Sequence, residues 1–239
     1  MKCECGHEFE PEIKYRHRLL CGDATDEDDV ERLMDGEQAE LTVTDPPYGV
    51  DRGEGFGGAE PFNGEGEEIK RKEYKGGWDN EIPDQSFYEN LEKYSGDIMI
   101  FGGNYFAHFL PQSKHWIVWD KKNTMPTFGD AELIWTNVER KSVVIYEYEY
   151  NGLINQEDEE RKHATQKPVK LISEMLKDYS ENENLILDSF LGSGSTLIAA
   201  EQMDRRCYGM EIDPQYVDVC VERWENLTGE TAERIPANE

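Results

Sequence analysis

The sequence predicts one α/β domain built on a mostly parallel, seven-stranded sheet with helices on both faces. Segments typical of strands and of helices alternate along most of the 239 residues, and strands joined by helices pair in parallel. A Gly-rich turn between a buried strand and a helix, within residues 185–200, is a second sign of this class. The length is sufficient for a single domain with a substantial core.

The expected strands are short segments rich in apolar residues. They are residues 17–22, 39–43, 97–103, 115–121, 141–150 and 206–213, together with the apolar start of 184–204. The segment 141–150 is expected to be long, and 97–103 to be buried. These segments alternate with helical ones, so the sequence predicts a sheet covered by helices rather than a β-sandwich.

The expected helices combine helical spacing of apolar residues with start and stop signals. They are residues 25–36, 84–95, 104–111, 168–180 and 214–229, together with the end of 184–204. Thr25 is the expected N-cap of the first helix and Gly36 closes it. Pro111 stops the short third helix, and Pro168 suits the first turn of the next one.

The charge and the cysteine content limit the class of protein. The 52 acidic and 25 basic residues give a net charge of −27, which predicts little nonspecific attraction to nucleic acid or anionic membranes. Such acidity suits a halophilic source, and an ordinary acidic protein is the alternative. Five cysteines without framework spacing favour a reducing cytoplasm over a disulfide-built fold. We expect neither a secretory leader nor a membrane span, because no sufficiently long apolar stretch occurs.

Two segments are expected outside the regular fold. Residues 51–80 are Gly-rich and charged, which predicts a long mobile loop. Residues 1–14 form an N-terminal extension before a single domain at 15–239. Cys3, Cys5 and His7 in this extension are too few and too poorly spaced for a structural zinc site, and a degenerate zinc knuckle is the alternative. No other metal site is expected.

Several chemically notable side chains are interpreted as core residues. They are Cys21, Cys207 and Cys220, which lie in apolar strand or helix segments, and Trp116, Trp119 and Trp135, which the sequence pattern places in the core. His115 and His163 have no recognisable partners for a catalytic triad, and the sequence contains no nucleophile elbow.

The Gly-rich turn predicts a ligand site. In LILDSFLGSGSTLIAA, Gly192 and Gly194 allow a ligand to approach the backbone, and the helix that follows offers free N–H groups. No lysine follows Gly194, so the segment is not a P-loop. The next strand ends at Glu211, 17 residues after Gly194, where an acid is placed to bind ribose hydroxyls. An adenosine-type ligand is therefore expected, and a plain tight turn followed by a surface acid is the alternative.

The segment TDPPYGV, residues 44–50, follows a strand at the edge where parallel sheets bind ligands. Pro46 has no N–H, and Pro47 holds the residue before it extended. The Asp45 carboxylate and the Pro46 carbonyl thus form two fixed acceptors, which suit the two N–H donors of an exocyclic amine. Tyr48 offers a flat face on which a base can stack. The alternative is a proline-rich turn without chemistry.

Together, DPPY and DSFLGSGST resemble the amino-methyltransferases of DNA, which transfer a methyl group from S-adenosylmethionine to adenine N6 or cytosine N4. The catalytic motif precedes the cofactor motif, as in the circularly permuted β-class of that family. HATQKPVKL, YGMEID, LLCGDA, IFGGNY and WIVWDKK resemble further family segments. The resemblance covers roughly residues 15–229 and implies a Rossmann-like methyltransferase fold. Residues 17–22 can supply the strand that this fold needs after Glu211.

The resemblance also implies the site residues. The catalytic ones are Asp45, Pro46, Pro47 and Tyr48. Those that bind the cofactor, S-adenosylmethionine, are Asp23, Thr165, Lys167, Asp188, Phe190, Gly192, Gly194, Thr196 and Glu211. By the resemblance, Asp23 meets the adenine amine, the segment 163–171 holds the methionine end and Glu211 binds the ribose.

The sequence departs from the family in its target-recognition region. Near residues 146–163, where β-class enzymes insert a recognition domain, only one strand and a polar link are expected. Specificity would then come from short loops or from a separate partner. The basic clusters at 70–75, 121–122 and 161–163 are candidates for DNA contact, and a solvated charge run is the alternative.

We expect a site-specific methyltransferase that flips its target base out of double-stranded DNA. Adenine N6 is favoured because, in this family, an initial Asp usually accompanies adenine and Ser accompanies cytosine. The alternatives are cytosine N4, an amine in RNA or protein, and a non-catalytic nucleic-acid-binding relative. A homodimer is a further expectation for its assembly.

Overall fold

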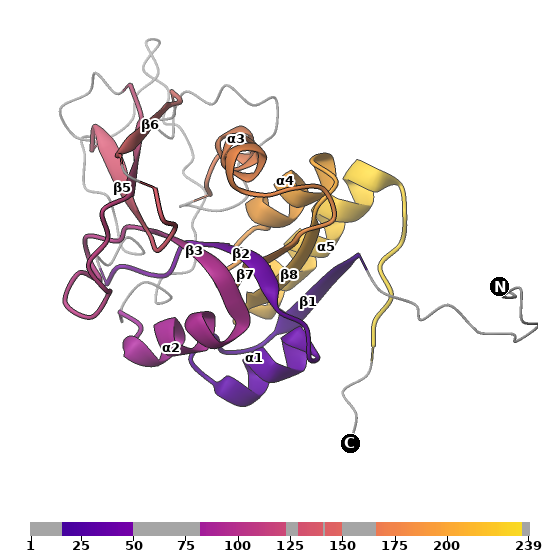
Figure 1. Ribbon diagram of the computed structural model, residues 1–239. Coiled ribbons are helices and arrows are strands. Elements are labelled where there is room, and N and C mark those ends of the chain that lie inside the picture. The colour runs from indigo at the N-terminus through magenta and orange to yellow at the C-terminus, as the bar shows by residue number, and fades with distance from the viewer. Residues whose placement is uncertain (1–15, 50–81, 123–128, 141, 150–165, 236–239) are drawn as a thin grey trace, which may run out of the picture.

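Eight strands form one sheet in the order β1-β8-β7-β2-β3-β5-β4-β6 in the computed structural model (Figure 1), which describes residues 16–49, 82–122, 129–140, 142–149 and 166–235. The strands are β1 (His17–Cys21), β2 (Ala39–Thr44), β3 (Ser95–Phe101), β4 (Trp116–Asp120), β5 (Ala131–Thr136), β6 (Val144–Glu147), β7 (Leu185–Asp188) and β8 (Arg206–Glu211). The helices are α1 (Glu27–Met34), α2 (Gln85–Tyr94), α3 (Val169–Tyr179), α4 (Ser195–Gln202) and α5 (Pro214–Thr228).

The sheet is mostly parallel, as expected, but its strand count differs from the prediction. Within the described ranges it has eight strands rather than seven, because β5 was not expected. β5 runs antiparallel to both of its neighbours, β3 and β4, whereas every other pairing is parallel. Its short sequence, AELIWT, carries little signal by itself, and the two neighbouring strands define it as a strand.

The N-terminal strand fills the edge that the permuted order leaves open. β1 pairs in parallel with β8, in a register that places His17 opposite Cys207 and Cys21 opposite Glu211. His17 Nδ1 also accepts a hydrogen bond from the Cys207 N–H at 3.0 Å. The expectation that residues 17–22 supply this strand is therefore confirmed.

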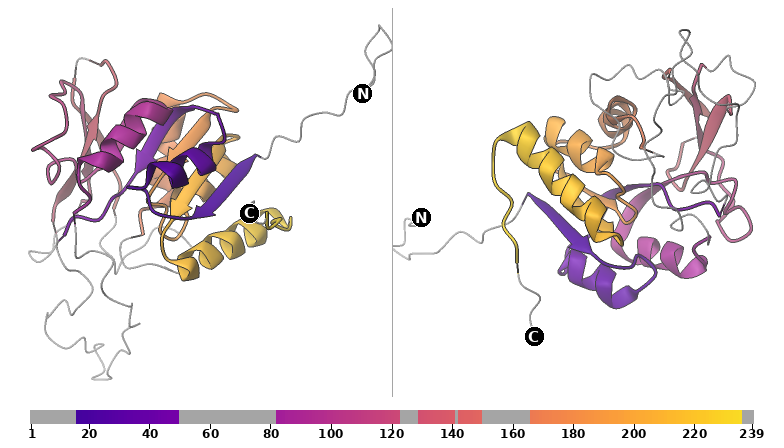
Figure 2. Two further views of the ribbon diagram at one scale, coloured as in Figure 1. Left: turned by 90° about the horizontal axis from the view of Figure 1, so that it is seen from below. Right: turned by 180° about the vertical axis from the view of Figure 1, so that it is seen from behind.

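Each face of the sheet has its own hydrophobic core, because side chains alternate along the buried strands. α1 and α2 lie on one face, and α3, α4 and α5 on the other (Figure 2). Leu41, Phe101 and Ile186 pack with the second group of helices. Ile100 and Leu187, each next to one of these residues in the chain, pack with the first group.

Some expected element boundaries are wrong. The N-cap of α1 is Asp26 rather than Thr25, because the Asp26 carboxylate accepts from the Asp28 N–H. Residues 104–111 form successive turns instead of a short helix. Phe106 in this segment is buried and lies edge-on to Phe87, whereas Tyr105 is exposed.

Four further expectations fail, two at element boundaries and two in the core. The strand expected over 141–150 is confined to β6, Val144–Glu147. Pro168 is the N-cap of α3 and stands just before its first turn. Cys21 is exposed at the end of the edge strand β1, and Trp116 is only partly buried. Cys207, Cys220, Trp119 and Trp135 are core residues, as predicted.

The sheet changes direction of winding between β7 and β2. α4 connects β7 to β8 on one side of this junction, whereas α2 connects β2 to β3 on the other side. The two helices also lie on opposite faces of the sheet (Figure 1). Parallel sheets of this kind bind ligands in the crevice at such a junction. Asp188, at the end of β7, and Asp45, just after β2, therefore meet where a site is expected.

Candidate active site

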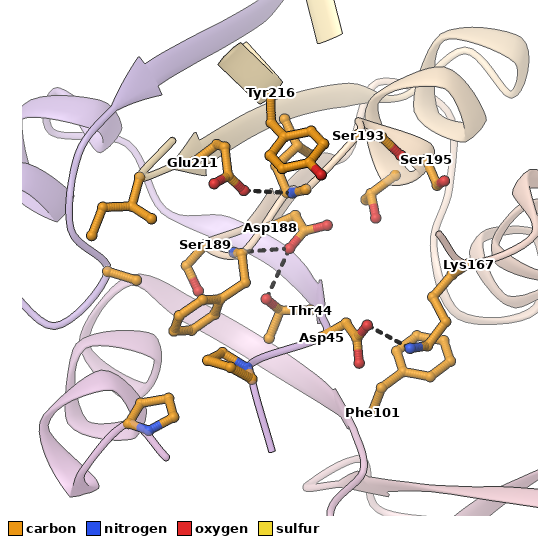
Figure 3. Close-up of a pocket in the computed structure, with 18 of the residues that line it drawn as sticks. Thr44, Asp45, Phe101, Lys167, Asp188, Ser189, Ser193, Ser195, Glu211 and Tyr216 are labelled. Carbon is orange, nitrogen blue, oxygen red and sulfur yellow. Dashed lines mark hydrogen bonds and ion pairs between the residues drawn. The ribbon is translucent and has the colours of Figure 1, made fainter. Parts of the chain in front are cut away.

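A cavity of about 530 Å³ opens at this junction, at the carboxyl ends of β2, β7 and β8 (Figure 3). Its volume is within the range of small-molecule sites. The predicted site residues that line it are Asp23, Asp45, Pro47, Lys167, Asp188, Phe190, Gly192, Thr196 and Glu211. The cavity thus brings together residues from five sequence motifs, which lie between residues 19 and 213 of the chain.

The Gly-rich turn shapes one wall of the cavity. Gly194 is the N-cap of α4 at φ 85°, and a Cβ there would lie 3.0 Å from Cys220 Sγ. Both the left-handed backbone and the close approach of α5 therefore require glycine. The start of α4 directs free N–H groups toward the end of this turn.

Glu211 connects the Gly-rich turn to the end of β8. Its carboxylate accepts the Gly192 N–H at 2.8 Å and the Asp213 N–H at 2.9 Å. Burial raises the pKa of Glu211, and the two backbone N–H groups oppose that shift. The carboxylate is thus held in place at the wall of the cavity, with lone pairs left to accept further hydrogen bonds.

Asp188 ties β7 to β2 at the base of the cavity. Its Oδ1 accepts the Thr44 hydroxyl at 2.8 Å and the Phe190 N–H at 3.2 Å (Figure 3). Burial raises the pKa of Asp188 to about 6, against the effect of hydrogen bonds from Thr196 and Thr44. This carboxylate fixes the distance between the two strand ends that carry the motifs.

Two serine hydroxyls identify the polar part of the cavity. Ser189 and Ser195 line it, and their buried Oγ atoms have no hydrogen-bond partner among the described residues. Buried hydroxyls normally have partners, because leaving one unpaired costs about 1–3 kcal/mol. The two hydroxyls suit a ligand with a charged polar end, such as an amino acid group. Both serines lie in the same segment as Gly192 and Gly194, which are predicted to bind the cofactor.

Asp45 lies across the cavity from Glu211 and is held by two donors. The Lys167 ammonium forms an ion pair with its Oδ2, and the Tyr48 hydroxyl donates to its Oδ1. Burial raises the pKa of Asp45, whereas Lys167 lowers it. Lys167 was expected at the methionine end of a cofactor, and the structure places its ammonium on the DPPY carboxylate.

The ring of Tyr48 does not present a free stacking face in this structure. Tyr48 is 7% exposed, and its ring stacks on Tyr105 at 4.7 Å between centroids and 10° between planes. Gly102, at φ 64°, lies so close that a Cβ there would collide with the same ring. A base can therefore stack on Tyr48 only after Tyr105 moves.

The remaining predicted residues fall just outside the cavity wall or outside the described ranges. Pro46 and Tyr48 are buried behind Asp45, and Gly194 supports the turn. Thr165 lies outside the described residues, as do Cys3, Cys5 and His7, His163, the loop 51–80 and the basic clusters at 70–75 and 161–163. The region near 146–163, where a reduced target-recognition region was predicted, is described only to residue 149.

Sequence reasoning missed several lining residues. They are Phe101, Gln166, Ser189, Ser193, Ser195 and Tyr216. The serines stand inside the recognised motif DSFLGSGST and could have been found there. Phe101 could have been found because it ends a buried strand, whereas Tyr216 on α5 carries no sequence signal.

The basic pair at 121–122 has partners within the chain. Lys121 Nζ lies 2.6 Å from Glu132, and Lys122 Nζ lies 2.7 Å from Glu147 and 3.1 Å from Asp120. These ion pairs reduce the attraction that either ammonium exerts on a phosphate. The pair is therefore a weaker candidate for DNA contact than the sequence suggested.

No group of three or more His, Cys, Asp or Glu side chains with metal-binding geometry occurs within the described ranges. None of the helices described is long and apolar enough to cross a membrane.

Comparison with known proteins shows which family part of the chain resembles. A family described as DNA methylase, of the N6/N4 type, matches residues 134–222, from β5 into α5. A type II methyltransferase of Moraxella bovis, M2.MboI, is 29% identical over 127 residues, which are 52% of this chain and 46% of the relative. The chain is therefore similar to the DNA amino-methyltransferases over these residues.

A second curated relative supports the same similarity. M.HinfI, a type II methyltransferase of Haemophilus influenzae, is 25% identical over 171 residues, which are 56% of this chain and 48% of that protein. The chain thus spans about half the length of the curated relatives it matches. The family match contains Lys167, the Gly-rich turn and Glu211, whereas DPPY precedes it.

Solved structures of DNA methyltransferases share the fold. A complex of M1.HpyAVI with SAM aligns with a TM-score of 0.58 and 15% identity, over 87% of this chain and 99% of that one. The cytosine-N4-specific PvuII DNA methyltransferase aligns with a TM-score of 0.55 and 14% identity, over 87% and 88% of the two chains. The predicted Rossmann-like methyltransferase fold is therefore confirmed.

Proposed function

We propose that this chain transfers a methyl group from S-adenosylmethionine to the exocyclic amine of a base in DNA, with adenine N6 as the acceptor. One observation carries the proposal: the DPPY carboxylate Asp45 and the cofactor-side acids Asp188 and Glu211 line the same cavity. The family match, the type II methyltransferase relatives and the fold support it. The preference for adenine rests on the Asp that begins DPPY.

The residues present fit the cofactor. Glu211 has lone pairs for the ribose hydroxyls. The Ser189 and Ser195 hydroxyls, which lack partners among the described residues, suit the charged amino acid end. Asp23, at the rim of the cavity, is placed for the adenine amine. When bound, the cofactor supplies a methyl group on a positively charged sulfur, which is already activated toward a nucleophile.

The chain's own contribution is to position the acceptor amine. A base inside a duplex cannot reach the cavity, so it must be flipped out of the stack. The Asp45 carboxylate and the Pro46 carbonyl then accept the two N–H groups, which keeps the nitrogen lone pair directed at the methyl group. We propose that Tyr105 swings away as the base enters, and that the base takes its place on the Tyr48 ring.

The direct test is transfer of a labelled methyl group from S-adenosylmethionine to DNA, RNA and protein substrates in parallel. We expect label in double-stranded DNA, and N6-methyladenine after digestion to nucleosides. N4-methylcytosine instead would correct the base and leave the reaction class unchanged. Label in RNA or protein alone, or cofactor binding without transfer to any substrate, would refute the proposed function.

The location and the assembly of the enzyme stay predictions. We propose that it acts in the cytoplasm on double-stranded DNA. A homodimer or a separate specificity partner would compensate for a short target-recognition region.

The Tyr48 hydroxyl is expected to matter for activity, because it donates to Asp45. In the wild type this hydrogen bond lowers the pKa of Asp45. Tyr48→Phe removes the hydrogen bond, so the pKa of Asp45 rises further in the variant. Asp45 acts as an ionised acceptor, and activity therefore appears as the pH rises through its pKa. We expect the acid limb of the kcat profile to move to higher pH, with kcat about tenfold lower at pH 7.

The matched control for this variant is Tyr88→Phe. The Tyr88 hydroxyl also donates to a carboxylate, that of Glu92 at 2.8 Å, but on α2 and away from the cavity lining. An unshifted profile in Tyr48→Phe would limit the role of Tyr48 to its ring.

The net charge of −27 predicts an unusual salt dependence of DNA binding. Proteins that bind DNA through many lysines and arginines lose affinity steeply with salt. Here the acidic surface repels DNA at low salt, and screening reduces the Debye length from about 30 Å at 0.01 M to about 3 Å at 1 M. We expect affinity for one duplex to fall weakly or to rise between about 0.05 and 2 M KCl, and activity to peak above physiological salt. A steep, monotonic loss from low salt would contradict this expectation.

A further inference from the structure

A line of alternating charges runs from the cavity into the sheet. Asp45 pairs with Lys167, and the Lys167 ammonium lies 3.5 Å from Glu132 Oε2. The other oxygen of Glu132, Oε1, lies 2.6 Å from Lys121 Nζ. The four side chains come from four different segments: Asp45 follows β2, Lys167 precedes α3, Glu132 lies on β5 and Lys121 follows β4.

All four side chains are largely buried. Their exposed fractions are 9% for Lys167, 15% for Glu132, 18% for Lys121 and 20% for Asp45. Charges withdrawn from water in this way are tolerated only when they are paired. Lys167 has more than one carboxylate partner, however. Asp45 alone would neutralise its charge, and Glu132 is a second carboxylate near the same ammonium.

The geometry gives Glu132 a specific role toward Lys167. An ammonium has three donors and can serve two carboxylates at once. The Lys167 ammonium also lies 5.2 Å from the Phe101 ring centroid and 5.7 Å from that of Tyr48, so aromatic rings flank it. Glu132 therefore attracts the Lys167 ammonium by its charge at 3.5 Å, while the ammonium lies closer to Asp45. An ammonium paired with Asp45 alone would occupy more of the acceptor capacity of that carboxylate.

We propose that Glu132 is a positioning residue for the methyl transfer: it shares the Lys167 ammonium with Asp45, so that the Asp45 carboxylate remains available to the target amine. This inference rests on the proposed function and deepens it. Glu132 itself is not among the cavity-lining residues. It acts through Lys167, which lines the cavity and reaches Asp45.

The pH profile distinguishes this role from a merely structural one. The groups that act on Asp45 are Lys167 and Tyr48, which lower its pKa, and Glu132, which raises it. Asp188 faces the same region and interacts with Asp45. Replacing Glu132 by glutamine removes a negative charge, so the pKa of Asp45 falls. The acid limb of activity then moves to lower pH, opposite to the shift expected for Tyr48→Phe.

The experiment compares Glu132→Gln with the wild type at saturating cofactor and DNA. We expect kcat to fall about 10- to 100-fold, as for other losses of positioning, and both KM values to stay within about threefold. The matched control is Glu147→Gln on β6, which removes an exposed carboxylate from its ion pair with Lys122. This control should retain the kcat and the pH profile of the wild type.

A second variant and a second readout keep the test decisive. Glu132→Gln removes the ion-pair partner of Lys121, which can impair folding. The double variant Glu132→Gln with Lys121→Gln removes both charges. It should show the same loss of kcat. Titration of the Asp45 carboxyl carbon by NMR, assigned with Asp45→Asn, reports the change in its pKa without any turnover.

Three outcomes are distinguishable. A lower kcat with the shifted acid limb supports the inference. Unchanged kcat and unchanged Asp45 titration in both Glu132 variants overturn it, as does a rise in cofactor KM that matches the loss of activity. A wild-type protein that methylates no DNA refutes the proposed function instead, while the NMR titration still tests the coupling of Glu132 to Asp45.

Discussion

Replacing Asp45 by alanine or asparagine is expected to abolish methyl transfer while cofactor affinity stays within about threefold of the wild type. Asp45 lies at the DPPY side of the cavity, across from the Gly-rich turn and Glu211. Losing the charged acceptor that orients the nucleophile should raise the barrier by about 3 kcal/mol or more, which is at least a 100-fold loss of kcat. Single-turnover methyl transfer and calorimetric titration of the cofactor measure the two quantities.

The asparagine variant separates chemistry from folding. Asn keeps the shape of the side chain and one carbonyl acceptor but removes the charge that pairs with buried Lys167. Glu132 remains as a counter-charge for that lysine, so we expect a folded protein, which thermal unfolding can verify. Asp35→Asn is the control, because Asp35 forms a surface ion pair with Arg18 at 2.7 Å. Near-normal turnover in Asp45→Asn would remove Asp45 from the mechanism.

Replacing Glu211 by alanine is expected to weaken cofactor binding by roughly 1.5–3 kcal/mol, or about 10- to 150-fold in Kd. The variant removes the proposed acceptor for the ribose and also the carboxylate that holds the Gly192 and Asp213 N–H groups. At saturating cofactor, kcat should change much less, because Glu211 does not contact the acceptor amine. Isothermal titration calorimetry gives the affinity directly.

The cofactor affinity of Glu211→Gln should fall between that of Glu211→Ala and that of the wild type, since the amide oxygen of glutamine still accepts one backbone N–H. Glu225→Gln is the matched control, because Glu225 also accepts a backbone N–H, that of Ala232 at 2.8 Å, but away from the cavity lining. Burial raises the pKa of Glu211, so the wild-type affinity should decrease as the pH falls through that pKa. Unchanged affinity in both Glu211 variants would place the ribose elsewhere.

Local sequence was sufficient to locate the two halves of the site. A strand that runs into DPPY and a strand that runs into a Gly-rich turn both end at the same edge of a parallel sheet. Asp45, Asp188 and Glu211 could therefore be expected around one crevice from the order of these motifs in the chain. The permuted motif order also predicted that residues 17–22 would form the edge strand, and β1 pairs with β8 accordingly.

Tertiary packing decided the environment of each of these residues. The partners of Asp45 are Lys167 and, through it, Glu132, which stand far from it in the sequence. β5, which carries Glu132, could not be recognised from six residues, because it is defined by pairing with β3 and β4. The stacking of Tyr105 on Tyr48 likewise depends on how the turns after β3 pack.

The sequence by itself thus determined the fold class, the strand ends that carry the candidate site residues and the type of ligand to expect. These depend on hydrophobic period, proline and glycine geometry, and motif order, which are local properties of the chain. The charge line from Asp45 to Lys121 and the covered face of Tyr48 were decided by the tertiary structure alone. The physical reason is that burial and pairing depend on which distant segments meet, and local patterns do not encode these contacts.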